Sequence, residues 1–81
     1  MKIPKIKDAK VIDINTILVT FTNGEIKKYD IKRLSDNEIF APLKNYAYFK
    51  NIKIENGGYA VFWDSNIDIS EYELWQNGET A

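Results

Sequence analysis

Asp30, paired with Asp68 or with Asp64, is the nearest approach to a catalytic site in this chain of 81 residues. A pair of carboxylates can divide acid and base roles between them. The chain contains no histidine and no cysteine, so the commonest general base and the thiolate metal ligands are missing. Each aspartate also suits a structural role, Asp30 as an acceptor for backbone N–H groups in the next turn and Asp68 near a helix start. We therefore expect no catalytic residue, no metal site and no cofactor.

Four basic residues close together in the sequence suggest a second kind of function: Lys27, Lys28, Lys32 and Arg33. They lie near Tyr29 and Phe21, and proteins that bind single-stranded nucleic acids place basic and aromatic side chains together on a sheet. The pI of the chain is about 5.3, however, which differs from the basic footprint of nucleic-acid-binding domains. Nucleic-acid binding is therefore the alternative hypothesis and not the leading one.

Large aromatic residues suggest a third possibility, because tryptophan and tyrosine are enriched in protein interfaces. Trp63 belongs to an expected core face, and we assign it to the core. Trp75 lies near the end of the chain on a short expected helix, together with Tyr72 and Glu71. We take these three as candidate partner-binding residues, although core packing and partner contact stay equally open for Trp75.

Charge is distributed unevenly along the chain. Residues 1–53 hold all eleven bases and six acids, a net charge of +5, whereas residues 54–81 hold six acids and no base. The two parts could attract each other, a second copy of the chain or an outside partner. Isoleucine, lysine and asparagine account for 30 of the 81 residues, so compositional drift is an alternative explanation of this asymmetry.

Length and composition indicate one soluble domain, residues 1–81, with its core at about residues 4–78. The hydrophobic fraction of 44% is ample for a core, and the charged fraction of 28% is ordinary for a globular protein. The longest apolar run, residues 59–63, is far too short to span a membrane. The absence of cysteine favours the cytoplasm.

The first half of the chain predicts three strands, at residues 6–14, 17–22 and 25–31. Asn23-Gly24 between the last two is the pair that best accepts a type I′ turn, in which both central residues have positive φ. A two-residue loop would pair Phe21 with Ile26 and Leu18 with Tyr29. These pairs lie on opposite faces, so we expect apolar residues on both sides of this hairpin.

The middle of the chain predicts one main helix and a second hairpin. We expect residues 32–41 to form a loop with a short helical turn, and Pro42 to begin a helix over residues 42–49. Strands at residues 51–55 and 59–63 flank the turn residues Asn56-Gly57-Gly58. A core face is expected from five of their residues: Ile52, Ile54, Tyr59, Val61 and Trp63.

The end of the chain predicts a short helix opened by Ser70. Ser70 and Glu73 have the spacing of a capping box, in which each side chain accepts from the other residue's backbone N–H. Gly78 ends the helix, and residues 79–81 are expected to fray. The predicted class is α+β, with a small, mainly antiparallel sheet of four to five strands, the order β-β-β-α-β-β-α, and one main helix packed on the sheet.

Several short motifs occur in a characteristic order: Val19-Thr20-Phe21-Thr22-Asn23-Gly24-Glu25, Tyr29-Asp30-Ile31, Leu43 with Phe49, Ile52-Lys53-Ile54, and Trp63 with Ile67-Asp68-Ile69-Ser70 leading to Leu74. Over about residues 4–78 they resemble a bacterial family catalogued as domain of unknown function family 2442. The family often has a Pro-Asn/Asp-Gly turn after its tryptophan, where this chain has Asp64-Ser65-Asn66. This departure affects the expected geometry of one turn.

The resemblance implies a binding partner more than an activity. Such modules are often encoded beside another small protein and in mobile elements, which suggests the binding partner of a two-gene, toxin–antitoxin-like pair. The absence of catalytic chemistry and the uneven charge point in the same direction. We therefore expect a non-enzymatic protein-interaction module that binds a small cognate protein or a second copy of itself.

Overall fold

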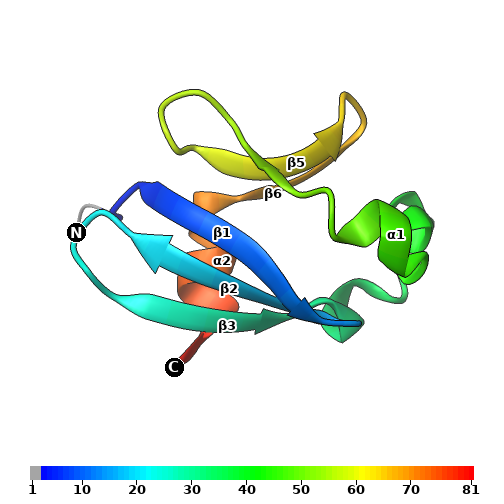
Figure 1. Ribbon diagram of the computed structural model, residues 1–81, viewed down its shortest axis with the longest axis horizontal. Coiled ribbons are helices and arrows are strands. Elements are labelled where there is room, and N and C mark those ends of the chain that lie inside the picture. Colours follow the sequence, from blue (N-terminus) through cyan, green and yellow to red (C-terminus); the bar gives the residue numbers. More distant parts are fainter. Residues whose placement is uncertain (1–2) are drawn as a thin grey trace.

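Two antiparallel sheets and a short helix surround one core in the computed structural model, which describes residues 3–81 (Figure 1). The larger sheet has the order β1-β2-β3-β7, formed by β1 (Ile6–Asp13), β2 (Thr16–Phe21), β3 (Ile26–Asp30) and β7 (Glu79–Thr80). The smaller sheet has the order β4-β5-β6, formed by β4 (Lys53–Ile54), β5 (Ala60–Asp64) and β6 (Ile67–Ser70). The α+β class is confirmed, but the expected single sheet is wrong.

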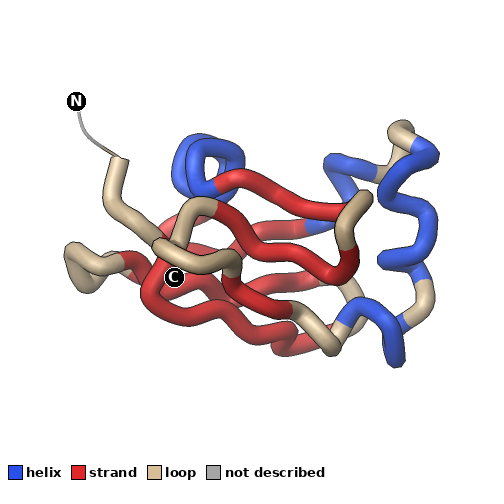
Figure 2. Tube along the Cα trace, turned by 90° about the horizontal axis from the view of Figure 1, so that it is seen from above, coloured by secondary structure: helices blue, strands red, loops and turns tan. Residues whose placement is uncertain are grey.

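The helices are short and gather in two places (Figure 2). They are the 3₁₀-helices η1 (Ile31–Leu34) and η2 (Glu38–Lys44) and the α-helices α1 (Tyr46–Phe49) and α2 (Glu71–Asn77). The expectation of one main helix is wrong, because no helix within residues 3–81 exceeds seven residues. None of the helices in this described part has the length and apolar character needed to cross a membrane.

The helix expected over residues 42–49 is divided at Asn45. Pro42 lies inside η2 instead of starting an α-helix, and α1 begins only at Tyr46. Asn45 has an extended backbone, and its side-chain oxygen accepts a hydrogen bond from the Tyr48 N–H at 3.3 Å. Asparagine is a favoured N-cap, and an N-cap residue leaves the helical conformation. The cap at Asn45 therefore starts a new helix where the sequence pattern predicts a continuous one.

The first hairpin turns through three residues, not two. The Gly24 N–H donates to the Phe21 carbonyl at 3.0 Å, and the Phe21 N–H donates to the Glu25 carbonyl at 2.8 Å. Gly24 has a φ of +90°, whereas Asn23 does not take a positive φ. The expected type I′ turn is therefore wrong, and the loop is of the three-residue kind that ends in a left-handed glycine.

The longer loop shifts the strand pairing by one residue. Two expected pairs change partners: Phe21–Ile26 becomes Thr20–Ile26, and Leu18–Tyr29 becomes Ile17–Tyr29. A shift of one residue moves side chains to the other face of a strand. As a result Ile17, Val19 and Tyr29 share one face and have no exposed surface. The prediction of two apolar faces for this hairpin is wrong.

The second hairpin has the register of a loop centred on residues 57–58, with Ile54 paired to Val61. Four of the five expected face residues lie in or against the core: Ile52, Ile54, Val61 and Trp63. Tyr59 lies beyond the last strand pair and is 55% exposed, so its expected place on the core face is wrong.

Two strands are missing from the sequence prediction. β6 pairs with β5 and alternates the buried Ile67 and Ile69 with exposed residues. β7 pairs with β3 through Thr80 and Lys27, in the segment 79–81 that was expected to fray. That expectation is wrong, because the polar end of the chain is held by backbone hydrogen bonds.

One hydrophobic core joins both sheets and α2. Its members come from every layer: Ile6, Ile17, Val19, Phe21, Tyr29, Leu43, Phe49, Val61, Trp63, Ile67, Ile69 and Leu74. The Trp63 ring stacks on Phe49 with a centroid distance of 6.1 Å, and its Nε1–H donates to the Phe49 carbonyl at 2.7 Å. The short segment η2–α1 is thereby fixed to the smaller sheet.

Gly58 is a point of backbone contact between the second hairpin and β1. The Ile6 N–H donates to the Gly58 carbonyl at 2.9 Å, and Gly58 has a φ of +76°. A Cβ atom at Gly58 would lie 2.5 Å from the Ile6 carbonyl oxygen. Gly24 also has a positive φ, but a Cβ atom there would meet nothing within 4 Å. A substitution at Gly24 therefore tests backbone strain alone, whereas one at Gly58 tests backbone strain together with close packing.

We expect Gly58→Ala to destabilise the fold more than Gly24→Ala. Both variants lose about 1–2 kcal/mol because an L-residue disfavours positive φ. Only Gly58→Ala also pushes the second hairpin away from β1, which adds about 1–3 kcal/mol. Urea denaturation of the two variants measures both free energies of unfolding. Equal losses would contradict the close contact at Gly58.

Candidate functional site

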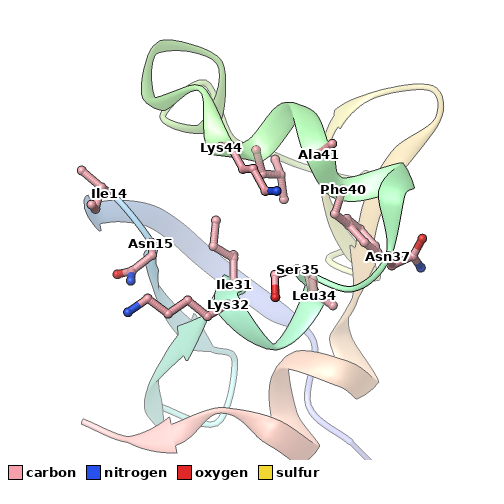
Figure 3. Close-up of a pocket in the computed structure, with 11 residues that line it drawn as sticks. Ile14, Asn15, Ile31, Lys32, Leu34, Ser35, Asn37, Phe40, Ala41 and Lys44 are labelled. Carbon is pink, nitrogen blue, oxygen red and sulfur yellow. The ribbon is translucent and has the colours of Figure 1, made fainter.

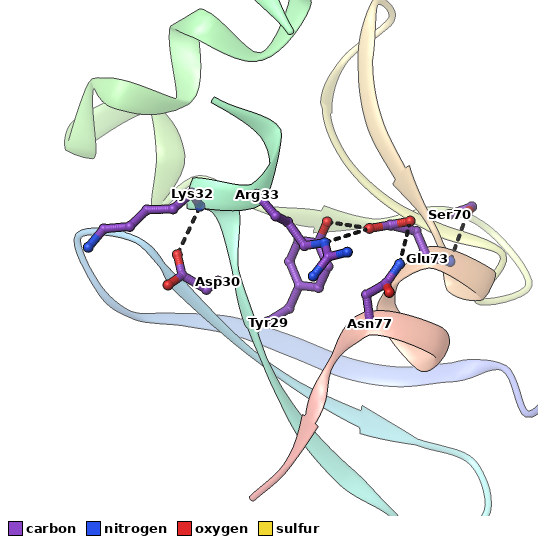
Figure 4. A network of polar contacts seen from close by, with 7 residues as sticks. All are labelled: Tyr29, Asp30, Lys32, Arg33, Ser70, Glu73 and Asn77. Carbon is purple, nitrogen blue, oxygen red and sulfur yellow. Dashed lines mark hydrogen bonds and ion pairs between the residues drawn. The ribbon is translucent and has the colours of Figure 1, made fainter. Parts of the chain in front are cut away.

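The Glu73 carboxylate is the centre of a polar network between α2 and β3 (Figure 4). Its Oε2 accepts a hydrogen bond from the Tyr29 hydroxyl at 2.7 Å and lies 3.3 Å from Arg33 Nε. Its Oε1 accepts from Asn77 Nδ2 at 2.9 Å. The Glu73 N–H donates to Ser70 Oγ at 3.1 Å. One half of the expected capping box is present, but the carboxylate faces Tyr29 instead of returning to Ser70.

The Tyr29 hydroxyl acts as a hydrogen-bond donor in this network. Burial, and then the hydrogen bond to Glu73, raises the pKa of Tyr29 above its usual value of 10.0. The hydroxyl therefore keeps its proton at neutral pH. The Tyr29 residue has no exposed surface, so its ring offers no face to a substrate. The arrangement ties α2 to β3 and is suited to stability more than to catalysis.

Asp30 and Asp68 lie on strands of different sheets. Asp30 Oδ1 accepts the Lys32 N–H at 2.8 Å and so caps η1. Asp68 is exposed on β6 opposite Phe62, and no hydrogen bond to its carboxylate comes from residues 3–81. Within the same described residues no group of three or more acidic side chains could hold a metal ion. The structure does not bring the two aspartates into a common site.

Trp75 packs on the larger sheet. Its ring meets Phe21 edge to face, with the centroids 5.1 Å apart and an interplanar angle of 83°. Lys27 Nζ lies 4.2 Å from the centre of the Trp75 ring and donates to the Trp75 carbonyl at 2.7 Å. Such edge-to-face and cation–π contacts hold an aromatic ring in place. Of the two roles that the sequence leaves open for Trp75, core packing has visible contacts.

Tyr72 and Glu71 differ in how much they offer to a partner. Tyr72 is 57% exposed on α2. Glu71 is partly buried, and its Oε1 accepts from Lys5 Nζ at 2.7 Å. Its Oε2 is buried and has no hydrogen-bond partner among the residues described. Of the three candidate partner-binding residues, Tyr72 is the one with an exposed side chain.

The four basic residues of the nucleic-acid alternative do not form one surface. Lys27 forms a cation–π contact with Trp75 of α2, and Arg33 forms an ion pair with Glu73. Lys28 and Arg33 line a polar hollow of about 360 Å³ whose other charged residues are two carboxylates. Lys32 lines a separate groove. A phosphate chain would meet divided and partly compensated charge here.

An apolar groove of about 260 Å³ opens between η1, η2 and the turn that joins β1 to β2 (Figure 3). Six apolar residues line it: Ile14, Ile31, Leu34, Phe40, Ala41 and Leu43. Leu43 is 1% exposed and belongs to the core, whereas Ile14 is 72% exposed at one end. The groove therefore reaches from the hydrophobic core to solvent, as ligand and partner sites commonly do.

The groove does not follow from the sequence pattern, which predicts a loop with a short helical turn over residues 32–41. A weak indication was present in the spacing of Ile31 with Leu34 and of Phe40 with Leu43. Residues three apart share a face of a 3₁₀-helix. Two such pairs on successive short helices could have indicated two apolar walls facing each other.

Comparison with known proteins gives one match. A family model described as "Protein of unknown function (DUF2442)" matches residues 6–80, nearly the whole chain. No curated protein and no solved structure matches the chain. The family match confirms the resemblance found in the sequence motifs, and it spans every residue that lines the groove.

We expect Tyr29→Phe to lower the free energy of unfolding by about 1.5–3 kcal/mol, the usual contribution of a hydrogen bond to a charged group. Tyr72→Phe is the control. The Tyr72 side chain is exposed, so loss of its hydroxyl should change the free energy of unfolding by less than about 0.5 kcal/mol. Urea denaturation compares the two variants with the wild type. Wild-type stability in Tyr29→Phe would show that the network does not anchor α2.

The free energy of unfolding should fall as the pH rises above 10.0, the usual pKa of tyrosine. Unfolded Tyr29 then loses its proton while folded Tyr29 keeps it, so the unfolded state becomes favoured. Burial, and then the hydrogen bond to Asp64, raises the pKa of Tyr48 to about 12, which adds to the effect. Urea midpoints below and above pH 10 measure the slope. We expect a shallower slope in Tyr29→Phe, and an unchanged slope would contradict this assignment.

Proposed function

We propose that this chain, which belongs to the DUF2442 family of proteins of unknown function, is a non-enzymatic module that binds a small cognate protein. The observation that carries the proposal is the apolar groove between η1 and η2. Exposed apolar surface that continues from a core into a concave site is typical of surfaces that bind a partner.

The walls of the groove are held in place before any partner binds. Asp30 caps η1, and Asn37 caps η2 by accepting the Ile39 N–H at 3.2 Å. The Ile31 N–H donates to the Asn15 carbonyl at 2.9 Å, which fixes η1 to the turn after β1. A preformed site loses less conformational entropy on binding. These bonds support a binding role for a surface formed by short helices.

The groove favours binding over catalysis. Its charged lining residues are Lys32 and Lys44, and its one hydroxyl is that of Ser35. A serine nucleophile needs an adjacent general base. No carboxylate and no histidine lies among the lining residues to serve as that base. Catalytic lysines are desolvated, whereas Lys32 and Lys44 are exposed, so the lining is suited to holding an apolar side chain more than to activating a nucleophile.

α2, one segment that a second copy of the chain could offer to the groove, is poorly suited to it. The exposed aromatic residue of α2, Tyr72, lies beside glutamates that already have intramolecular partners. Glu71 binds Lys5, and Glu73 binds Tyr29. The family resemblance adds that such modules are often encoded beside another small protein. We therefore propose that the partner is the product of the adjacent gene, in a two-gene pair of toxin–antitoxin-like or mobile-element type.

Co-expression with the protein encoded by the adjacent gene tests the proposal. We expect the two proteins to elute together in size-exclusion chromatography. Ile14→Glu combined with Ala41→Glu places two carboxylates on exposed lining positions and should weaken binding at least about tenfold, or about 1.4 kcal/mol. Ile12→Glu combined with Ile39→Glu is the matched control, because both are exposed residues that do not line the groove and the added charge is the same.

Two results would contradict the proposal. One is separate elution of the two wild-type proteins at low salt. The other is a complex that forms equally well with the Ile14→Glu/Ala41→Glu variant, which would place the interface elsewhere. Circular dichroism of each variant before mixing shows whether it is folded.

A further inference from the structure

We infer that the groove accepts an acidic segment, in which a bulky apolar side chain lies next to aspartate or glutamate. This inference rests on the proposed function and specifies the partner surface. It is carried by the charge of the lining. Lys32 on η1 and Lys44 on η2 are the charged lining residues, one on each wall, and the lining includes no carboxylate.

Both lysines have uncompensated charge. Neither ammonium group forms a salt bridge with a carboxylate of residues 3–81, whereas Lys5 and Arg33 do. Lys32 and Lys44 are also exposed. A carboxylate on a bound segment would therefore find a cation on either wall without displacing an existing partner. A basic segment would meet two like charges in the same place.

The volume of the groove suits individual side chains of a bound segment better than a whole cofactor. At about 260 Å³ it lies below the range of about 300–1,000 Å³ typical of small-molecule pockets. An apolar side chain would rest on the floor formed by Leu43 and between Ile31 and Phe40. Short helical or extended segments bind such grooves through one or two apolar anchors, with flanking charges that set specificity.

The polar hollow beside Lys28 and Arg33 lacks these features. It is lined by polar residues, and its two cations, Lys28 and Arg33, are accompanied by Asp30 and Glu79. Its floor is not apolar, and its lining carries charges of both signs. The groove between η1 and η2 thus combines an apolar floor with unpaired cations, whereas this polar hollow does not.

A phage-displayed library of short random peptides, selected on the immobilised full chain, tests the inference. We expect the enriched peptides to carry leucine, isoleucine, phenylalanine or tryptophan within two residues of aspartate or glutamate. Their affinity should fall at least about fivefold on the Lys32→Glu/Lys44→Glu variant, because two exposed ion pairs are lost and two like charges take their place. Lys7→Glu/Lys10→Glu is the matched control, because it makes the same change in net charge at two exposed lysines outside the groove.

The outcomes separate this inference from the proposed function. Peptides that Ile14→Glu/Ala41→Glu blocks but that show no acidic preference would overturn the inference and leave the groove as a protein-binding site. Equal weakening by both lysine pairs would show a general charge effect and would also overturn it. Selection of acidic, apolar peptides whose binding is weakened by Lys32→Glu/Lys44→Glu and not by Lys7→Glu/Lys10→Glu supports it. A stronger salt dependence of the association rate in the wild type than in that variant is the second supporting result.

Discussion

The hydrogen bond between Tyr29 and Glu73 is a polar link between the larger sheet and α2, beside the apolar contacts that Leu74 and Trp75 make with the same sheet. It fixes α2 to β3, and it does so at a fully buried ring. Asp30 follows Tyr29 directly and caps η1, so the position of Tyr29 also decides where η1 leaves the sheet. Because Ile31 and Leu34 of η1 form one wall of the groove, the candidate binding surface depends on this interaction in the core.

The shared core explains why short elements suffice. β4 and β7 have two residues each, and α1 has four. Elements of this length are not stable alone. They are held because Trp63 and Phe49 join the helical segment to the smaller sheet, while Tyr29 and Leu74 join the larger sheet to α2. Apolar surface stays uncovered in the groove between the 3₁₀-helices η1 and η2. Leu43 of η2 belongs both to the lining of this groove and to the core.

Local chemistry made part of this structure predictable. The α+β class, the positions of the first strands, the Ser70 cap and the burial of Trp63 follow from residue type and alternation. Loop length was harder to predict, because Asn23-Gly24 suits both a two-residue turn and the end of a three-residue loop, and this one-residue difference decides which side chains are buried. β7 and the groove depend on contacts between distant segments, and neither has a strong local pattern.

Methyl cross-saturation NMR can show directly whether a partner protein covers the groove between η1 and η2. The deuterated, methyl-protonated chain would be bound to the unlabelled protein of the adjacent gene, and the partner's protons would be irradiated. We expect the strongest intensity losses at the methyl groups of Ile14, Ile31 and Leu34, and little loss at Ile26, which is exposed on β3 outside the groove. Losses concentrated at Ile26, with Ile14 and Leu34 unaffected, would contradict this expectation.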